Sequence, residues 1–171
     1  WPATPGDPDV TTWIYDDATG QLVQKLYDDG KGPAYTYTAA GQLETRTWAR
    51  MDANGDPLVT TYHYDPATGE QLGIDYSDNT PDVTYAYNRT GQKETVTDAA
   101  GTYVFAYDAK GQLISETHPV GNTTMTIERK NDNLGRNTGY ILQNADNEPM
   151  QKVTYGYDQA GRFKRVQWQN G

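Results

Sequence analysis

Four aspartates, Asp16, Asp65, Asp108 and Asp158, each follow a pair of aromatic residues and precede a glycine by three or four positions. Such a set of carboxylates could act in acid–base chemistry or bind a metal. Two catalytic carboxylates need different environments to take different roles, and equivalent positions of a repeat do not provide them. Asp and Gly also form tight turns, because the Asp carboxylate binds backbone N–H groups and Gly adopts positive φ. We therefore interpret these aspartates as turn residues.

A second group of oxygen ligands lies in the segment DANGDP, where Asp52, Asn54 and Asp56 have the spacing of the first three ligands of a calcium loop. Pro57 stands where that loop needs glycine, and the twelfth position is His63 instead of glutamate. A hairpin turn around the Asn-Gly pair explains the segment better. These three residues are a weak candidate metal site, and we expect neither a metal nor a cofactor.

The remaining composition excludes several classes of chemistry. The chain has no cysteine, two histidines and a net charge of −9. Disulfides, cysteine-based zinc sites and thiol nucleophiles are therefore ruled out, and Ser77 and Ser115 lie outside any Gly-x-Ser-x-Gly elbow. The acidic balance disfavours nucleic acid and anionic membranes as partners, and no apolar run is long enough to enter a bilayer. We expect a protein that is not an enzyme; catalysis by turn Asp and Glu residues is the weakest alternative.

The elements that must position these residues form a repeat. Each copy has two aromatic residues two positions apart, then Asp or another polar residue, then Gly, then a segment of alternating apolar and polar residues. The copies span Trp13–Leu22, Tyr35–Leu43, Tyr62–Leu72, Tyr85–Lys93, Phe105–Leu113 and Tyr155–Phe163, with a degraded copy at Arg129–Asn137. The framework residues are Tyr15, Asp16, Gly20, Tyr35, Tyr37, Gly41, Tyr62, Tyr64, Asp65, Gly69, Tyr85, Tyr87, Gly91, Phe105, Tyr107, Asp108, Gly111, Tyr155, Tyr157, Asp158 and Gly161.

This pattern predicts an all-β fold of antiparallel β-hairpin repeats. Residues two apart on a strand share one face, so the aromatic pairs should form columns that stabilise the sheet. About seven repeats should give about fourteen short strands in a twisted, curling or spiralling β-sheet. We expect a Pro-rich N-terminal extension at residues 1–10 and a single repeat domain at residues 11–171. The chain begins without Met, so we expect it to be a segment of a longer protein.

The pattern Y-x-Y-D-x-x-G-[RQ]-L resembles the YD repeat, also called the RHS (rearrangement hotspot) repeat. The resemblance extends from about Thr11 to Trp168, with departures at Thr38, Asn88 and Lys93. It implies a secreted or cell-surface bacterial protein whose repeats form a long sheet, spiralling in toxins into a hollow shell around a C-terminal effector. It also implies a structural or adhesive role, with links to carbohydrate binding. Partners would be flanking repeats, another copy at the sheet edges, a glycan or a cell-surface protein.

A carbohydrate-binding module is the alternative function, using exposed aromatic residues and turn carboxylates. The candidates lie outside the columns: Trp48, Tyr76, Tyr103, Tyr140 and Trp168. In strict alternation Trp48 has the opposite parity to Leu43, and Trp168 the opposite parity to Phe163. We therefore expect both tryptophans on the face of the sheet opposite the core.

Overall fold

The structure, a computed structural model, describes residues 9–171 and divides the chain into two compact units. The first unit ends at Asp82 and the second runs from Val83 to Gly171. The Pro-rich extension predicted at residues 1–10 lies outside the described residues except for Asp9 and Val10. No helix within residues 9–171 is long and apolar enough to cross a membrane.

Six strands make up the first unit. They are β1 (Thr12–Tyr15), β2 (Leu22–Leu26), β3 (Ala34–Tyr37), β4 (Leu43–Met51), β5 (Pro57–Tyr64) and β6 (Gln71–Tyr76). Each pairs in antiparallel fashion with its neighbours in the chain. Within the described part of this unit, β1 has β2 as its single strand partner, so this end of the sheet is open.

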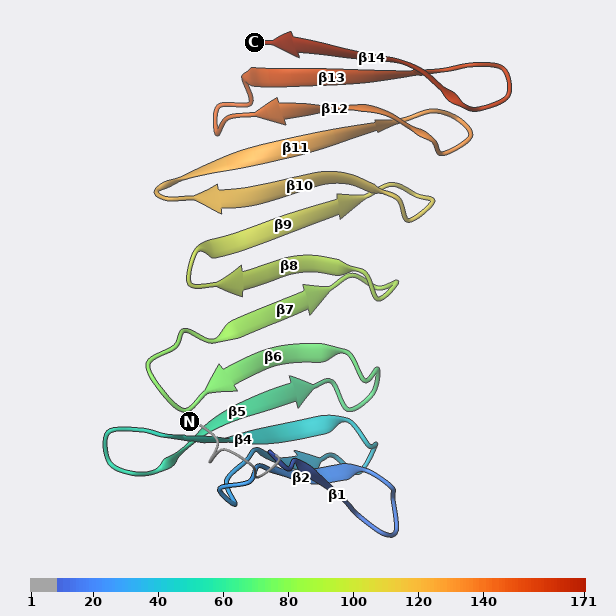
Figure 1. Ribbon diagram of the computed structural model, residues 1–171. Helices are drawn as coiled ribbons and strands as arrows, with labels where there is room; N and C mark the ends of the chain where they lie inside the picture. Colours follow the sequence, from blue (N-terminus) through green and yellow to red (C-terminus); the bar gives the residue numbers. More distant parts are fainter. Residues whose placement is uncertain (1–8) are drawn as a thin grey trace. The chain divides into compact units, whose positions relative to one another are not determined.

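Eight strands make up the second unit. They are β7 (Val83–Tyr87), β8 (Lys93–Asp98), β9 (Gly101–Tyr107), β10 (Leu113–Val120), β11 (Thr123–Asn131), β12 (Asn137–Gln143), β13 (Pro149–Tyr157) and β14 (Phe163–Asn170). Figure 1 shows them as a ladder in which each strand lies beside the next. β14 pairs with β13 alone among the described strands, so this sheet also ends at an open edge.

These strands confirm the predicted all-β fold of antiparallel hairpins. Their order in space follows their order in the chain because short turns connect them. Repeat turns close after the second aromatic residue of each copy, as at Gly111, whose N–H donates to the Asp108 carbonyl at 2.9 Å. Gly111 has a φ of 79°, the left-handed conformation that this turn position requires and that glycine adopts without strain.

Each repeat turn is followed by a shift of one residue in the strand register. In the β3–β4 hairpin, Tyr37 lies opposite Leu43 but Thr36 lies opposite Thr45, so Glu44 is an extra residue in β4. The same shift occurs at Tyr157 and Phe163 in the β13–β14 hairpin. Such a β-bulge changes which residues after the turn share a face with the residues before it.

Little of the described chain is fully buried. Val153 is the buried hydrophobic residue, at 2% exposure, and Thr60 is the buried polar residue, at 3%, among residues 9–171. The aromatic columns are half-buried, except for Trp13 and Tyr15 on β1, which are exposed. Stability therefore has to come from contacts along the sheet, between neighbouring strands, as in other repeat proteins.

Candidate functional site

The aspartates of the repeat lie in turns and accept backbone hydrogen bonds. Oδ1 of Asp108 accepts from the N–H of Lys110 at 2.8 Å and from that of Gln112 at 2.9 Å. Oδ1 of Asp158 accepts from the N–H of Ala160 and of Arg162, each at 2.9 Å. A carboxylate held in this way stabilises a turn. The equivalent carboxylates lie in separate turns, each at the end of a strand.

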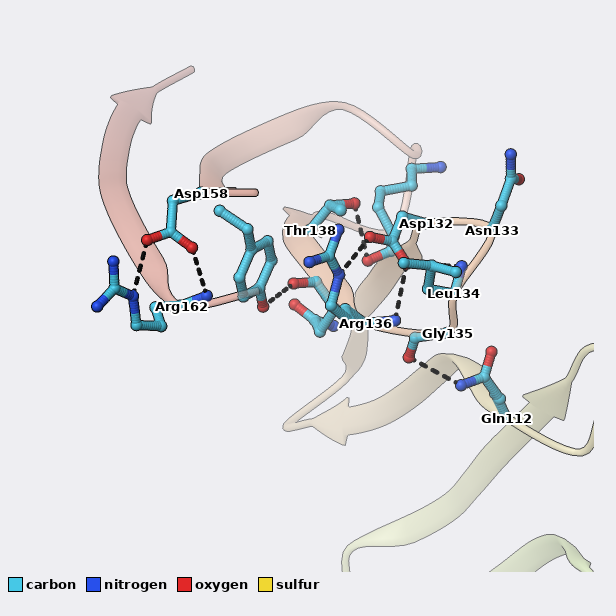
Figure 2. Close-up of polar contacts among 12 residues, drawn as sticks. Gln112, Asp132, Asn133, Leu134, Gly135, Arg136, Thr138, Asp158 and Arg162 are labelled. Atoms are coloured by element: carbon cyan, nitrogen blue, oxygen red, sulfur yellow. Dashed lines mark hydrogen bonds and ion pairs between the residues drawn. The ribbon is translucent and has the colours of Figure 1, made fainter. Parts of the chain in front are cut away.

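In four copies a glutamine follows the repeat glycine and joins one repeat to the next. Its side-chain Nε2 donates to the backbone carbonyl of the next repeat glycine, as from Gln112 to Gly135 at 3.0 Å (Figure 2). Sequence reasoning missed this contact, although the recurring Gly-Gln pair was a visible signal. The other such bonds run from Gln21 to Gly41 (3.1 Å), Gln42 to Gly69 (2.8 Å) and Gln92 to Gly111 (2.8 Å).

The second tyrosine of the aromatic pair also links one repeat to the preceding one. Its hydroxyl donates to a backbone carbonyl at the start of the return strand of the preceding repeat. The second position of the aromatic column therefore also supplies hydrogen bonds between repeats, a role that phenylalanine could not fill. These bonds run from Tyr37 to Leu22 (2.8 Å), Tyr64 to Leu43 (2.9 Å), Tyr107 to Lys93 (2.9 Å) and Tyr157 to Asn137 (2.6 Å).

Replacing Tyr107 with phenylalanine is expected to lower the free energy of unfolding by about 1 kcal/mol, because the carbonyl of Lys93 loses its hydroxyl donor. Urea denaturation followed by circular dichroism measures the change. Tyr15→Phe is the matched control, since the Tyr15 hydroxyl makes no hydrogen bond within residues 9–171. Equal losses in the two variants would show that the hydroxyl contact contributes nothing.

Arginine replaces glutamine in the last two repeats. Nε of Arg136 donates to Oδ2 of Asp132 at 2.7 Å, and Nε of Arg162 donates to Oδ2 of Asp158 at 2.8 Å (Figure 2). Each arginine thus pairs with the aspartate of its own turn. The degraded copy keeps its turn as well, with the N–H of Gly135 donating to the Asp132 carbonyl at 2.9 Å.

The turn aspartates should make the stability of the fold depend on pH. Hydrogen bonds lower the pKa of Asp132 and Asp158, chiefly those from the backbone N–H groups of Arg136 and Arg162. The pKa is also lowered at Asp16, Asp52, Asp65 and Asp78. Since the folded-state pKa lies below the unfolded one, the stabilisation is complete above the unfolded pKa of about 3.9 and is lost as pH falls through the folded value.

We therefore expect the urea midpoint to fall as the pH drops below about 4. Measurements at pH 7, 5 and 3 test this expectation. The Asp132→Asn variant keeps an oxygen acceptor but no titrating group, so its midpoint should fall less steeply. A midpoint that rises on acidification would contradict the assignment of these carboxylates to turn stabilisation.

The strand register shows which residues share a face of each sheet. Trp48 follows Arg46 by two residues, and Arg46 lies opposite Tyr35. The indole N–H of Trp48 donates to Thr60 Oγ1 at 2.9 Å. Trp48 therefore shares a face with the tyrosine columns, and the expected placement on the opposite face is wrong. The β-bulge after Leu43 supplies the extra residue that reverses the parity.

The expected placement of Trp168 on the face opposite the core, in the second unit, is wrong as well. Trp168 lies opposite Val153, two residues from Tyr155, and Phe163 lies opposite Tyr157 on the same face. The other face carries small and polar residues, with threonine hydroxyls paired across strands. These pairs are Thr36–Thr45 (2.7 Å), Thr97–Thr102 (2.9 Å) and Thr117–Thr126 (3.0 Å). Each sheet thus has one aromatic face and one threonine-rich face.

Two of the five predicted ligand-binding aromatics lie together. Trp48 and Tyr76 line a shallow hollow of about 220 Å³ in the first unit, with Arg50 and Leu58. The guanidinium of Arg46 lies over the indole ring of Trp48, 3.5 Å from its centroid. A sugar that stacks on this ring face would have to displace that cation–π contact, which is favourable in its own right.

The other three predicted aromatics do not join this hollow. Tyr103 packs edge-on against His118, with ring centroids 5.4 Å apart. Tyr140 is half-buried on β12, opposite Val153 of β13. Trp168 is 68% exposed on the open strand β14. A binding site that uses all five residues does not form within one unit.

The weak calcium candidate folds as a turn. Oδ1 of Asp52 accepts from the N–H groups of Asn54 and Asp56, each at 2.8 Å, and Oδ2 accepts from the Asn54 side-chain amide at 3.2 Å. Both oxygens of this carboxylate are therefore engaged within the turn. In the part of the chain that the structure describes, no three His, Asp or Glu residues gather to hold a metal ion.

Comparison with known proteins identifies the repeat. Residues 87–124, which include the turn at Gly91 and the hairpin from Phe105 to Leu113, match the family model described as RHS Repeat. This part of the chain is similar to the RHS repeat family. The match confirms the resemblance drawn from the Y-x-Y-D-x-x-G pattern. No curated protein matches the chain as a whole.

Solved structures share the fold of these RHS repeats. TcdB2-TccC3 without the hypervariable C-terminal region matches with a TM-score of 0.54 and 19% identity, over 95% of this chain and 10% of that chain. TcdB2-TccC3-TEV matches with a TM-score of 0.54 and 18% identity, over 94% of this chain and 10% of that chain. The chain therefore spans about a tenth of the length of these solved chains.

Proposed function

We propose that this RHS-repeat chain is a non-enzymatic structural module, one stretch of a shell, stalk or adhesive surface of a secreted or cell-surface bacterial protein. The observation that carries the proposal is the set of links between repeats. Repeat glutamines and tyrosines, the most regular polar residues of the chain, donate hydrogen bonds to the backbone of a neighbouring repeat. These side chains therefore serve to join successive repeats into a longer sheet.

Two further observations support this role. Catalysis would need free turn carboxylates, but these accept hydrogen bonds from backbone N–H groups, as at Asp108. The fold of this chain also matches about a tenth of each of two much longer solved chains. A segment of a continuous wall would give such a match. In this role flanking repeats are the main partners, joined through the strand edges.

Removal of one repeat tests the structural role. Deleting residues 92–111 joins Gly91 to Gln112 at equivalent repeat positions, so the chain should still fold, with a lower unfolding midpoint. Deleting residues 86–104 is the matched control. It joins Tyr85 to Phe105 and so leaves one extra residue inside a strand, which reverses the faces of the sheet on one side of the junction and should abolish cooperative unfolding. If both deletions unfold alike, the repeat is not an exchangeable structural unit.

Carbohydrate binding is the second candidate, supported by the hollow that Trp48 and Tyr76 line together. A glycan array probed with the intact chain and with its Trp48→Ala variant separates the two functions. A structural module should give signals at background level for both proteins. A glycan that binds the intact chain and loses at least about tenfold in affinity on Trp48→Ala would replace the structural proposal with the binding one.

A further inference from the structure

The hairpin of β4 and β5 departs from the regular ladder. Between the pairs Thr47–Val59 and Met51–Pro57, three residues of β4 face one residue of β5. The equivalent hairpin of β10 and β11 keeps a constant register up to its turn. Bulges re-aim side chains and are common beside functional sites. Trp48 and Arg50 are two of the bulged residues, and both line the hollow in the first unit.

Hydrogen bonds hold the walls of this hollow in place. The indole N–H of Trp48 donates to Oγ1 of Thr60, the buried polar residue of the described chain. The N–H of Val59 donates to Ser77 Oγ at 2.8 Å, and the N–H of Ser77 donates to the Val59 carbonyl at 2.9 Å. Side chains that are fixed in this way by their neighbours form a preorganised site.

Two guanidinium groups lie beside the Trp48 ring without an acceptor. They belong to Arg46 and Arg50 and lie 3.5 and 5.3 Å from the ring centroid, so they are within about 9 Å of each other. Among the described residues neither forms an ion pair, and Nε of Arg46 is buried with no hydrogen-bond partner. The separation is comparable with the Debye length of about 8–10 Å, so salt does not fully screen the repulsion. An oxyanion would remove this repulsion and accept hydrogen bonds from the free guanidinium donors.

One carboxylate, that of Asp78, also lines the hollow. Its pKa is lowered by hydrogen bonds from the side chain and the N–H of Thr80, and to a smaller extent by the positive charge of Arg50. Oδ1 of Asp78 accepts the Thr80 N–H at 2.9 Å, so this carboxylate is held in its own turn. It balances one of the two arginines, and the hollow keeps an excess of positive charge in a chain whose net charge is −9.

The remaining wall suits a small flat ring. Tyr76 and Leu58 supply apolar surface, and the volume of the hollow is about 220 Å³. A cavity of about 150 Å³ is enough for benzene. The hollow therefore has room for one ring and an attached oxyanion, and it is smaller than the sites of about 300–1,000 Å³ that bind drug-sized ligands.

We propose that this hollow binds a small organic oxyanion, a phosphate or carboxylate group carried by a flat apolar ring. The oxyanion accepts hydrogen bonds from Arg46 and Arg50, and the ring lies against Tyr76. This mode leaves the cation–π contact between Arg46 and Trp48 in place, whereas a sugar stacked on that ring would displace it. The site goes beyond the proposed structural role, and it gives the hollow of the carbohydrate candidate a different class of ligand.

Isothermal titration calorimetry of the 171-residue chain with phenyl phosphate tests the proposal. We expect saturable binding that weakens at least about tenfold in Arg50→Gln, because the variant lacks a charged donor for the oxyanion. Arg89→Gln is the matched control. It removes the same charge from an exposed arginine of the second unit and should bind like the natural chain. Benzoate, titrated in the same way, identifies the oxyanion: the tighter of the two ligands carries the preferred group.

NMR spectroscopy locates the binding. The indole N–H resonance of Trp48, assigned by its loss in Trp48→Phe, should shift when phenyl phosphate is added to the natural chain and shift much less in Arg50→Gln. Circular dichroism confirms that each variant remains folded. The absence of saturable binding for both phenyl phosphate and benzoate overturns the proposal, as does equal weakening in Arg50→Gln and Arg89→Gln. Equal affinity for phenol, which has no oxyanion, overturns it too. The deletion and glycan-array experiments are unaffected by these outcomes, so a failure here is distinct from a failure of either proposed function.

Discussion

Replacing Gly139 with alanine is expected to lower the free energy of unfolding by about 4 kcal/mol, through backbone strain of about 1–3 kcal/mol and overpacking of about 1–3 kcal/mol. Gly139 lies on β12 with a φ of 143°, which an L-residue rarely adopts. A Cβ built there would lie 2.0 Å from the carbonyl oxygen of Val153 on β13. That oxygen belongs to the backbone of the most buried hydrophobic residue described, so it cannot move away at low cost.

Gly55→Ala is the matched control for this variant. Gly55 has a φ of 89°, but a Cβ built there meets nothing within 4 Å. Alanine at Gly55 should therefore cost only the strain, about 1–2 kcal/mol. Urea denaturation of both variants measures the difference. If Gly139→Ala costs no more than Gly55→Ala, β12 and β13 are not packed as closely as the structure places them.

The strands and turns could be predicted from the sequence because each rests on local chemistry. An aromatic pair two residues apart predicts a strand face, and Asp followed by Gly predicts the turn that ends it. In the copy from Phe105 to Leu113 both signals lie within nine residues. Repetition then fixes the topology, since short turns place each strand beside its predecessor.

The face that carries Trp48 could not be predicted, because it depends on one extra residue. Simple alternation from Leu43 reverses the side of every later residue once Glu44 forms a bulge. The glutamine links were missed for a different reason. Gln112 and Gly135 are 23 residues apart, and their bond becomes visible only when the strand register is known. Local chemistry thus predicted the elements, whereas the contacts between repeats required coordinates.

Another contact that required coordinates is the ion pair between Glu116 on β10 and Arg129 on β11. Glu116 lies directly opposite Ile127, so the pair is a diagonal one on the aromatic face. The side chain of Glu116 is 14% exposed and that of Arg129 is 34% exposed. Nε2 of His118 lies 3.6 Å from the second carboxylate oxygen of Glu116. One carboxylate therefore faces two basic side chains on a largely apolar surface.

Replacing Glu116 with alanine is expected to lower the free energy of unfolding by about 2–3 kcal/mol, because the guanidinium of Arg129 would remain partly buried without its carboxylate. The cost is below the figure for a fully buried pair, since water reaches about a third of the arginine side chain. Urea denaturation at neutral pH measures it. A double variant, Glu116→Leu with Arg129→Leu, should recover most of the loss, because apolar residues can replace such a pair on this face.

The pair between Glu128 and Lys130 supplies the matched control on the threonine-rich face. Glu128 lies on β11 opposite Ser115, and the two side chains of this pair are 38% and 49% exposed. Glu128→Ala should therefore change the free energy of unfolding by about 0–1 kcal/mol. Both glutamates belong to the same hairpin and differ in the face they occupy. Equal losses from Glu116→Ala and Glu128→Ala would mean that the aromatic face is as open to water as the threonine-rich one, and that the half-burial of the aromatic columns contributes little to stability.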